Sequence, residues 1–253
     1  MQQQTVRWND FAKRVLDIPE IQFVVNTHGI FFEKGMLSLV QEHVPCQTLQ
    51  NFQETFKWNN SPFSLLRVTR FIMDIVKGME FIHSYGFLHP GLSLRKVLLT
   101  EKGYCKLYDF SLSLDATNRI IFLKSKVTQS LNTLPLESWQ RNEYTQESDI
   151  WTLAVIIWQL LSSGTSPFSC EQTEYANLEN MLITPTTSDQ GLKIGNDILL
   201  KCWEKNSSLR PSLSQLRSSF ERIMSSAKAS SEETDSTNSY IPMVGNVKGN
   251  SGN

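Results

Sequence analysis

Residues 89–96 read His-Pro-Gly-Leu-Ser-Leu-Arg-Lys, and the segments on both sides of this stretch define the fold. Upstream, apolar residues within 65–84 recur at the spacing of one buried helix face, which predicts a long amphipathic helix. Downstream, the strand-like segments 97–100 and 104–108 are joined by a turn at Lys102-Gly103. The stretch should therefore form a loop between a helix and a pair of short strands.

The first part of the chain predicts one helix followed by a hairpin. Apolar residues in segment 6–17 have near-helical spacing, and Pro19 ends the helix soon after. Segments 21–32 and 36–44 are rich in β-branched and aromatic residues and flank the turn Glu33-Lys34-Gly35. Both strands should therefore pair as a hairpin.

The second half of the chain predicts mainly helices. Residues 111–133 have no clear periodicity and are expected to be irregular. The expected helical segments are 146–163, 172–182, 192–203 and 211–224. From residue 225 to 253 the composition turns to Ser, Asn, Gly, Thr and Lys, which predicts a disordered tail because few apolar groups can offset the entropy of ordering.

Composition and charge indicate an ordinary soluble protein. The chain has 253 residues, a formal net charge of -1 and 40% hydrophobic residues, so it carries no electrostatic footprint for nucleic acid or an anionic membrane. Its most apolar segment, 150–161, is shorter than the roughly 20 residues that span a bilayer. No secretion signal is expected at the start of the chain. Four scattered cysteines are expected to be reduced thiols in a cytosolic setting: Cys46, Cys105, Cys170 and Cys202.

Several short motifs occur in an order that resembles a protein kinase domain from its αC helix to its C-terminal end. Besides residues 89–96 they are Tyr108-Asp109-Phe110-Ser111, Leu134-Pro135-Leu136-Glu137, Ser148-Asp149-Ile150-Trp151, Cys202-Trp203 and Arg210-Pro211. Each motif alone is weak, whereas their joint order and spacing is specific. Arg95 matches the tyrosine-kinase pattern, so the resemblance is nearer to that branch.

The resemblance implies an α+β, protein-kinase-like fold with a truncated small lobe. Residues 1–44 would form a partial small lobe, made of an αC-like helix and a β-hairpin. Residues 45–224 would form the mostly helical large lobe, and residues 225–253 the tail.

The same resemblance implies that the residues needed for catalysis are replaced. In the family pattern His-Arg-Asp-Leu-x-x-x-Asn, the Asp accepts the substrate proton and the Asn holds magnesium. Here these positions are Gly91, which has no side chain, and Lys96, whose ammonium has donors but no lone pair for a cation. Asp109 is the one remaining position of the family's magnesium site. We therefore predict a pseudokinase with no catalytic residue.

Nucleotide binding is also expected to be weak or absent. No Gly-x-Gly-x-x-Gly loop precedes residue 20, and the family's Val-Ala-Ile-Lys lysine has no counterpart in this chain. ATP and magnesium would be cofactors only if an upstream part of the small lobe exists. The strand within 36–44 would also lack its family neighbour, which would leave an open edge.

Residues that stabilise the fold of the family are retained. The resemblance implies a buried ion pair between Glu137 and Arg210, and a hydrogen bond from the loop backbone to Asp149. His89 and Phe110 match positions in the family's hydrophobic spine. These five residues are expected to have structural roles.

The tail contains a motif for a signalling partner. Tyr240-Ile241-Pro242-Met243 resembles the Tyr-x-x-Met sites that recruit the regulatory subunit of phosphoinositide 3-kinase. Phosphorylation of Tyr240 would add charge and acceptor oxygens that an arginine pocket can bind. The alternative is that so short a motif arises by chance.

Three functions remain open from the sequence. The first is an inactive binding or allosteric scaffold in cytoplasmic signalling, either alone or as the intracellular part of a receptor. Its candidate partners are signalling proteins, including an active kinase. The second is a weak or unorthodox ATP-dependent protein kinase completed by upstream residues. The third is a non-functional truncated product, which the open strand edge favours.

Overall fold

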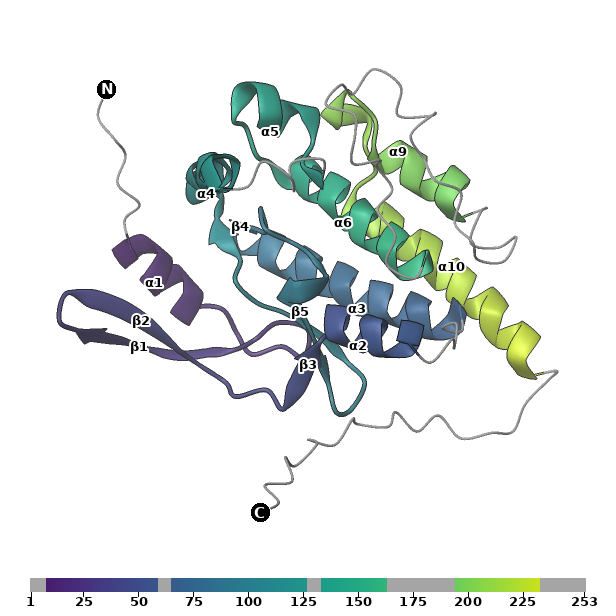
Figure 1. Cartoon of the computed structure of the whole chain (residues 1–253), viewed down its shortest axis with the longest axis horizontal. Coiled ribbons are helices and arrows are strands. Elements are labelled where there is room, and N and C mark those ends of the chain that lie inside the picture. Colours follow the sequence, from purple (N-terminus) through teal and green to yellow (C-terminus); the bar gives the residue numbers. More distant parts are fainter. Residues whose placement is uncertain (1–7, 59–64, 127–132, 163–193, 233–253) are drawn as a thin grey trace, which may run out of the picture.

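The computed structural model describes residues 8–58, 65–126, 133–162 and 194–232. Its helices form one block, and a β-hairpin extends from the side of the block opposite to the last helix (Figure 1). This arrangement is the α+β, kinase-like fold with a mostly helical large lobe that the sequence predicts.

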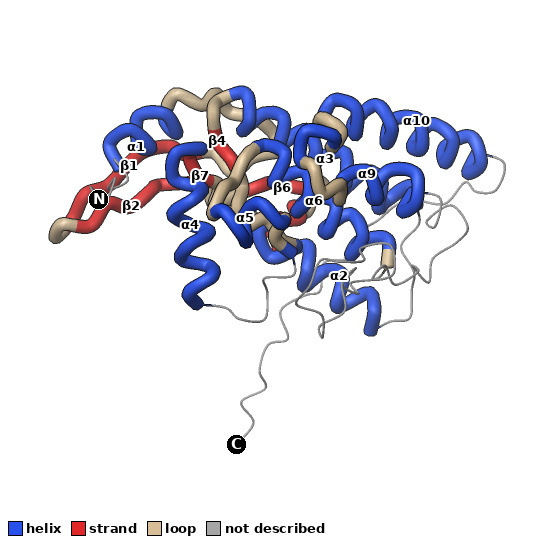
Figure 2. Tube along the Cα trace, turned by 90° about the horizontal axis from the view of Figure 1, so that it is seen from above, coloured by secondary structure: helices blue, strands red, loops and turns tan. Residues whose placement is uncertain are grey.

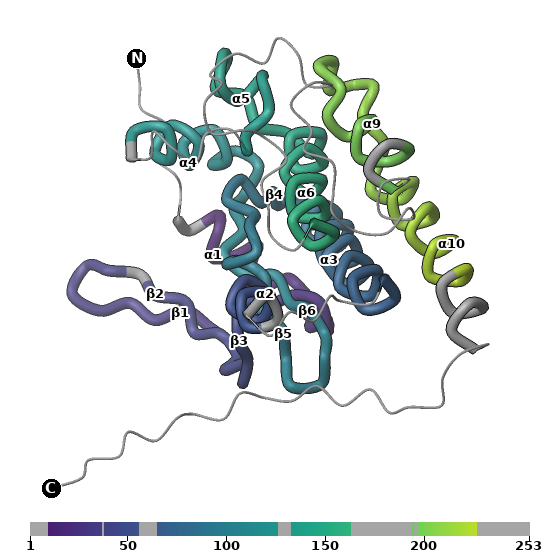
Figure 3. The backbone as a smooth tube through the Cα atoms, turned by 45° about the vertical axis from the view of Figure 1, so that its right-hand side comes forward, coloured from purple at the N-terminus to yellow at the C-terminus, as the bar shows by residue number. Residues whose placement is uncertain are grey.

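The long helix α3 (Leu65–Ser84) lies at the centre of the helical block and has the predicted bounds. It contacts α6 (Gln146–Leu161) and α10 (Leu213–Glu232), and the three helices lie side by side in Figure 3. Gly78 allows α3 to approach the strand layer closely, because an added Cβ would lie 2.9 Å from Leu107 Cδ1 and 2.9 Å from the Phe23 carbonyl oxygen. Ten buried residues of α3 make this helix the main support of the core.

Two small sheets flank the loop 89–96. The strands β5 (Val97–Thr100) and β6 (Cys105–Leu107) pair antiparallel as predicted, and β3 (Cys46–Thr48) adds to β5. A second pair joins β4 (Phe87–Leu88) to β7 (Ser111–Leu112). Both β3 and the helix α2 (Leu49–Trp58) that follows it were absent from the sequence prediction. The loop therefore lies between two pairs of strands that fix both of its ends.

The N-terminal part contains the predicted helix and hairpin. Helix α1 (Trp8–Leu16) packs Phe11 against Phe87, with ring centroids 5.9 Å apart. Strand β1 (Thr27–Glu33) pairs with β2 (Met36–Gln41) through a turn in which Gly35 has a φ of +80°. Strand β1 begins later than the predicted segment 21–32 because Val24 instead bridges to Leu107 beside the central sheet.

The hairpin extends away from the helices (Figure 2). Within the described residues β1 and β2 pair only with each other, which agrees with the expectation of an open edge. Two apolar side chains near the turn are largely exposed, Phe32 at 70% and Met36 at 71%. The hairpin thus presents apolar surface and unpaired backbone to solvent, a combination that favours strand pairing with another chain.

Helix α4 (Ser113–Lys126) corrects the expectation that residues 111–133 are irregular. Ala116 and Ile120, one helical turn apart, are fully buried in a cluster with Leu88, Leu134 and Tyr144. Asp115 in the first turn is also favourable for the helix dipole. Burial of this narrow apolar stripe explains why the segment is helical despite its weak overall periodicity.

The C-terminal helices agree with the prediction in part. Helix α5 (Leu136–Arg141) leads to α6, which is buried along most of its length. The predicted helix 192–203 contains a π-helical turn, Gly195–Leu199, followed by α9 (Leu200–Cys202). The predicted helix 172–182 lies outside the described residues. Helix α10 continues to Glu232, so the tail does not begin at 225 as expected, and residues 233–253 lie outside the description.

No helix in the described segments combines the length and apolar character needed to cross a membrane.

Candidate functional site

The loop 89–96 is fixed by a buried carboxylate on α6. The backbone N–H of His89 donates to both oxygens of Asp149, at 3.1 Å and 3.0 Å. Tyr144 donates its hydroxyl to Oδ1 at 2.7 Å, and His83 Nε2 lies 2.7 Å from Oδ2. Asp149 is fully buried, so its charge is stabilised by these polar contacts rather than by water. The structural role predicted for Asp149 thus has a direct geometric basis.

His89 is a core residue at the start of the loop. Its side chain is fully buried, and this burial lowers its pKa to about 4, although the charge of Asp149 acts in the opposite direction. At neutral pH the imidazole is therefore uncharged. Its environment suits packing rather than proton transfer with a solvent-exposed substrate.

Gly91 leaves the position of the catalytic base without a carboxylate. An added Cβ at this glycine would meet no heavy atom within 4 Å, and Gly91 is absent from the residues with positive φ. The local backbone thus does not require glycine at position 91.

Asp109 is held by two cations. Lys96 Nζ pairs with Oδ2, and Arg119 Nη2 donates to Oδ1 at 2.9 Å. Arg119 Nη1 also donates to the backbone carbonyl of Asp109 at 2.7 Å. Burial acts to raise the pKa of Asp109, but hydrogen bonds and charge from Lys96 and Arg119 outweigh it and lower the pKa. The carboxylate is therefore charged and paired on both oxygens.

This arrangement does not fit a magnesium ion. Magnesium requires several oxygen ligands in near-octahedral geometry. Here one family ligand position carries the Lys96 ammonium, and the oxygens of Asp109 are directed to the two cations. Among the residues that the structure describes, no cluster of three or more His, Cys, Asp or Glu side chains is placed to hold a metal.

Arg119 is a site residue that the sequence prediction missed. It lies on α4, in the segment that was expected to be irregular, and donates to the Asp109 oxygen that Lys96 does not pair with. The available signal was the spacing of Ala116 and Ile120 together with the absence of Gly and Pro from 111 to 134. Arg119, three residues after Ala116, lies beside the buried stripe.

A second basic side chain of α4, Lys124, contacts the α5 region near the other end of the helix. Lys124 Nζ donates to the carbonyl of Trp139 and to Asn142 Oδ1, the latter at 2.7 Å, and lies over the Trp139 ring. Burial lowers the pKa of Lys124. Helix α4 is thus bound to Asp109 through Arg119 and to the α5 region through Lys124.

The predicted ion pair of Glu137 and Arg210 is present and buried. Arg210 Nη1 and Nη2 donate to Glu137 at 2.6 Å and 3.0 Å, a bidentate geometry. Burial acts to raise the pKa of Glu137, but the Arg210 guanidinium lowers it below its usual value. Phe110 contacts the Phe87 ring edge-on, with centroids 5.1 Å apart, so its expected role in the core is also supported by geometry.

Among the described residues, the predicted site residues lie in two places. His89, Gly91, Lys96, Asp109, Phe110 and Asp149 gather around the loop, whereas Glu137 and Arg210 brace the base of α6. Tyr240 and Met243 lie outside the described residues. Besides Arg119, the prediction missed Tyr144 and His83, which contact Asp149 through hydrogen bonds that no local sequence pattern specifies.

Comparison with known proteins agrees with this geometry. The family model of protein tyrosine and serine/threonine kinases matches residues 2–220. The tyrosine-protein kinase receptor TYRO3 of Gallus gallus is 32% identical over 169 residues, which cover 64% of this chain and 19% of that receptor. The chain belongs to the protein tyrosine and serine/threonine kinase family and spans about a fifth of the length of this relative.

The buried ion pair yields a test of the scaffold. Replacing Glu137 by alanine would leave Arg210 charged and buried, so we expect the free energy of unfolding to fall by about 3–5 kcal/mol. The matched control is Glu143→Ala, because the pair of Glu143 with Arg141 is exposed on both side chains, and its loss should cost less than about 1 kcal/mol. Urea unfolding measures both changes, and equal losses would contradict the assigned role.

Proposed function

We propose that this chain is a catalytically inactive protein-kinase-like domain that acts as a binding or allosteric module in signalling. The observation that carries this proposal is the pairing of Asp109 with Lys96 and Arg119. The aspartate that would hold magnesium in an active kinase instead joins the loop to α4. Loss of a catalytic base at Gly91 removes a contribution of about 10² to 10⁴-fold from any phosphoryl transfer.

The integrity of the scaffold supports a binding role over a truncated, non-functional product. The Asp149 hydrogen bonds and the Glu137–Arg210 pair keep the loop and α6 in place, and none of these contacts requires the catalytic side chains that positions 91 and 96 lack. Buried polar groups with their partners absent would be costly, whereas these are satisfied. A domain that keeps its shape offers defined surfaces to partners even when it transfers no phosphate.

The similarity to a receptor tyrosine kinase supports a signalling context. The named relative is a receptor, and we propose that this domain works on the cytoplasmic side of a membrane, alone or as part of a receptor-type protein. Other signalling proteins, among them an active kinase, are the proposed partners. Neither ATP nor magnesium is a required cofactor in this proposal.

Measurement of phosphoryl transfer tests the proposed loss of catalysis. With ATP, magnesium and a tyrosine peptide, the wild-type chain and Asp109→Ala should both give only the background rate, because Asp109 is already engaged by two cations. Glu101→Ala, which removes an exposed carboxylate on a turn, is the matched control. Transfer that persists in Glu101→Ala but disappears in Asp109→Ala would favour the competing function, a weak protein kinase.

We also propose that Tyr240-Ile241-Pro242-Met243 docks a phosphotyrosine-binding module once Tyr240 is phosphorylated. A phosphate adds about -1.5 to -2 charges and three acceptor oxygens for an arginine pocket. The motif begins eight residues beyond Glu232, the last residue of α10.

A synthetic peptide of residues 234–248 tests this docking site. The phosphorylated peptide should bind the phosphotyrosine module of the phosphoinositide 3-kinase regulatory subunit in a calorimetric titration, and the unphosphorylated peptide should not. Replacement of Met243 by serine in the phosphorylated peptide should weaken binding if the motif is read as proposed. Equal binding with and without phosphate would overturn the assignment.

A further inference from the structure

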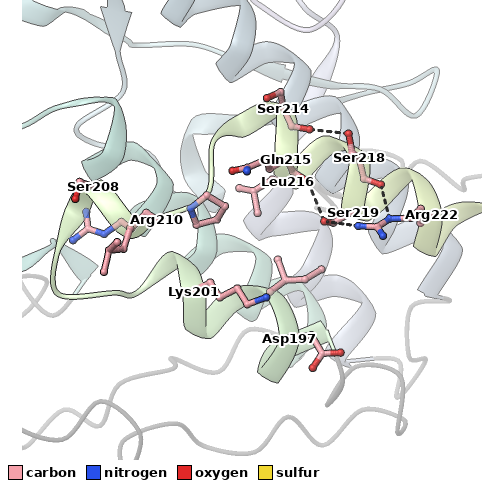
Figure 4. A pocket seen from close by; sticks show the side chains of 13 residues that line it. Asp197, Lys201, Ser208, Arg210, Ser214, Gln215, Leu216, Ser218, Ser219 and Arg222 are labelled. Carbon is pink, nitrogen blue, oxygen red and sulfur yellow. Dashed lines mark hydrogen bonds between the residues drawn. The ribbon is translucent and has the colours of Figure 1, made fainter.

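A cleft of about 730 Å³ lies between the helical segment 195–202 and the first turns of α10. The turn 208–211 closes one end of it (Figure 4). Its volume lies within the range of about 300–1,000 Å³ that is usual for ligand pockets. None of its lining residues belongs to the loop 89–96, so ligand binding here would not depend on the chemistry around Asp109.

The walls of the cleft are fixed by buried contacts. Leu216 lines the cleft from α10 and is 1% exposed, and Ile198 packs against the main core from the facing segment. At the start of α10, Ser212 and Gln215 bond to each other in a reciprocal cap, with Ser212 N–H donating to Gln215 Oε1 at 2.8 Å. The cleft therefore lies between two segments that each pack against the core.

Two basic side chains on facing walls give the cleft its chemistry. Lys201 is exposed on α9 and forms no hydrogen bond or ion pair with any residue in the described part of the chain. Arg222 on α10 donates only to the Ser218 carbonyl and to Ser219 Oγ, both at 3.4 Å, and meets no carboxylate there. Figure 4 places Lys201 and Arg222 on the two facing helical segments. Both cations thus keep donors for a ligand.

The third basic residue of the cleft does not contribute free charge. Arg210 is neutralised by Glu137, and its Nε donates to the Glu204 carbonyl at 3.0 Å. Asp197 is the acidic residue of the lining and forms no ion pair with Lys201 in the described part of the chain. Lys201 and Arg222 therefore outweigh Asp197, and the cleft favours an anionic ligand.

A neighbouring cavity has a different lining. It measures about 470 Å³, lies on the other side of the 208–214 turn and is lined by Glu80 and Glu147. Glu80 pairs with Arg217 at 3.3 Å. Lys201 and Arg222 line only the cleft beside α10. Leu209, which lines the cleft beside α10, is 65% exposed. A ligand could therefore make an apolar contact there besides its contacts with the basic side chains.

We propose that this cleft binds an acidic peptide segment of a partner protein. Its carboxylates or phosphates would contact Lys201 and Arg222, and an apolar side chain would cover Leu209. An extended peptide suits the site better than a single small ion, because the two cations lie on separate walls of an open cleft rather than around one point. The site is thus a surface for recognition of acidic partners.

Fluorescence anisotropy with three labelled peptides tests this proposal on the full chain. The probes alternate leucine with glutamate, with phosphoserine or with lysine. The glutamate or phosphoserine peptide should bind, and binding should weaken as ionic strength rises to about 1 M, where the Debye length is about 3 Å. The two acidic probes separate carboxylate from phosphate as the source of the anion, and the lysine peptide should not bind.

Charge-reversal variants locate the binding. Lys201→Glu/Arg222→Glu should raise the Kd of the acidic peptide at least about tenfold, because two attractive contacts become repulsive. The matched control Lys205→Glu/Lys102→Glu reverses two exposed lysines outside the cleft and should leave the Kd within about twofold. Equal weakening in both double variants, equal affinity for the lysine peptide, or no binding of either acidic peptide would overturn the proposal.

Discussion

The buried carboxylate of Asp149 is the constraint on which the rest of the structure depends. One charged group in the core accepts hydrogen bonds from the backbone of His89, from Tyr144 and from His83, and so joins α3, α6 and the loop. A buried charge is tolerated only when such partners are present, which ties the three elements to one geometry. These contacts fix His89, the first residue of the loop. Lys96, the last residue of the loop, pairs with Asp109 although it is not a catalytic residue of the family pattern.

Structural support and chemical competence are therefore separate properties of this domain. The residues that hold the loop contact it through the backbone, whereas the chemistry of an active kinase requires side chains at the positions of Gly91 and Lys96. Replacement of those side chains leaves the supporting contacts intact. Lys96 is incorporated into a new contact, since its ammonium pairs with the carboxylate that magnesium would otherwise need. Lys96 and Arg119 thus link the loop, Asp109 and α4.

Sequence patterns predicted those parts of the fold that local periodicity determines. The helix 65–84 and the strand 97–100 have the expected bounds, because burial of one face or of alternate residues leaves a regular apolar pattern. Strand β3 was missed since three residues give too short a pattern, and α4 was missed since its buried stripe is mainly Ala116 and Ile120. The pairing of Arg119 with Asp109 depends on that helix, so the sequence alone could not indicate this contact.

The pKa of Asp109 tests the central claim most directly. A ¹³C NMR titration of the side-chain carboxyl should give a pKa below the ordinary aspartate value of about 3.9, because Lys96 and Arg119 stabilise the charged form. The double variant Lys96→Met/Arg119→Met should raise that pKa, and magnesium should leave the wild-type carboxyl resonance unchanged. An ordinary pKa that the double variant does not alter, or a saturable shift of this resonance with magnesium, would contradict the account.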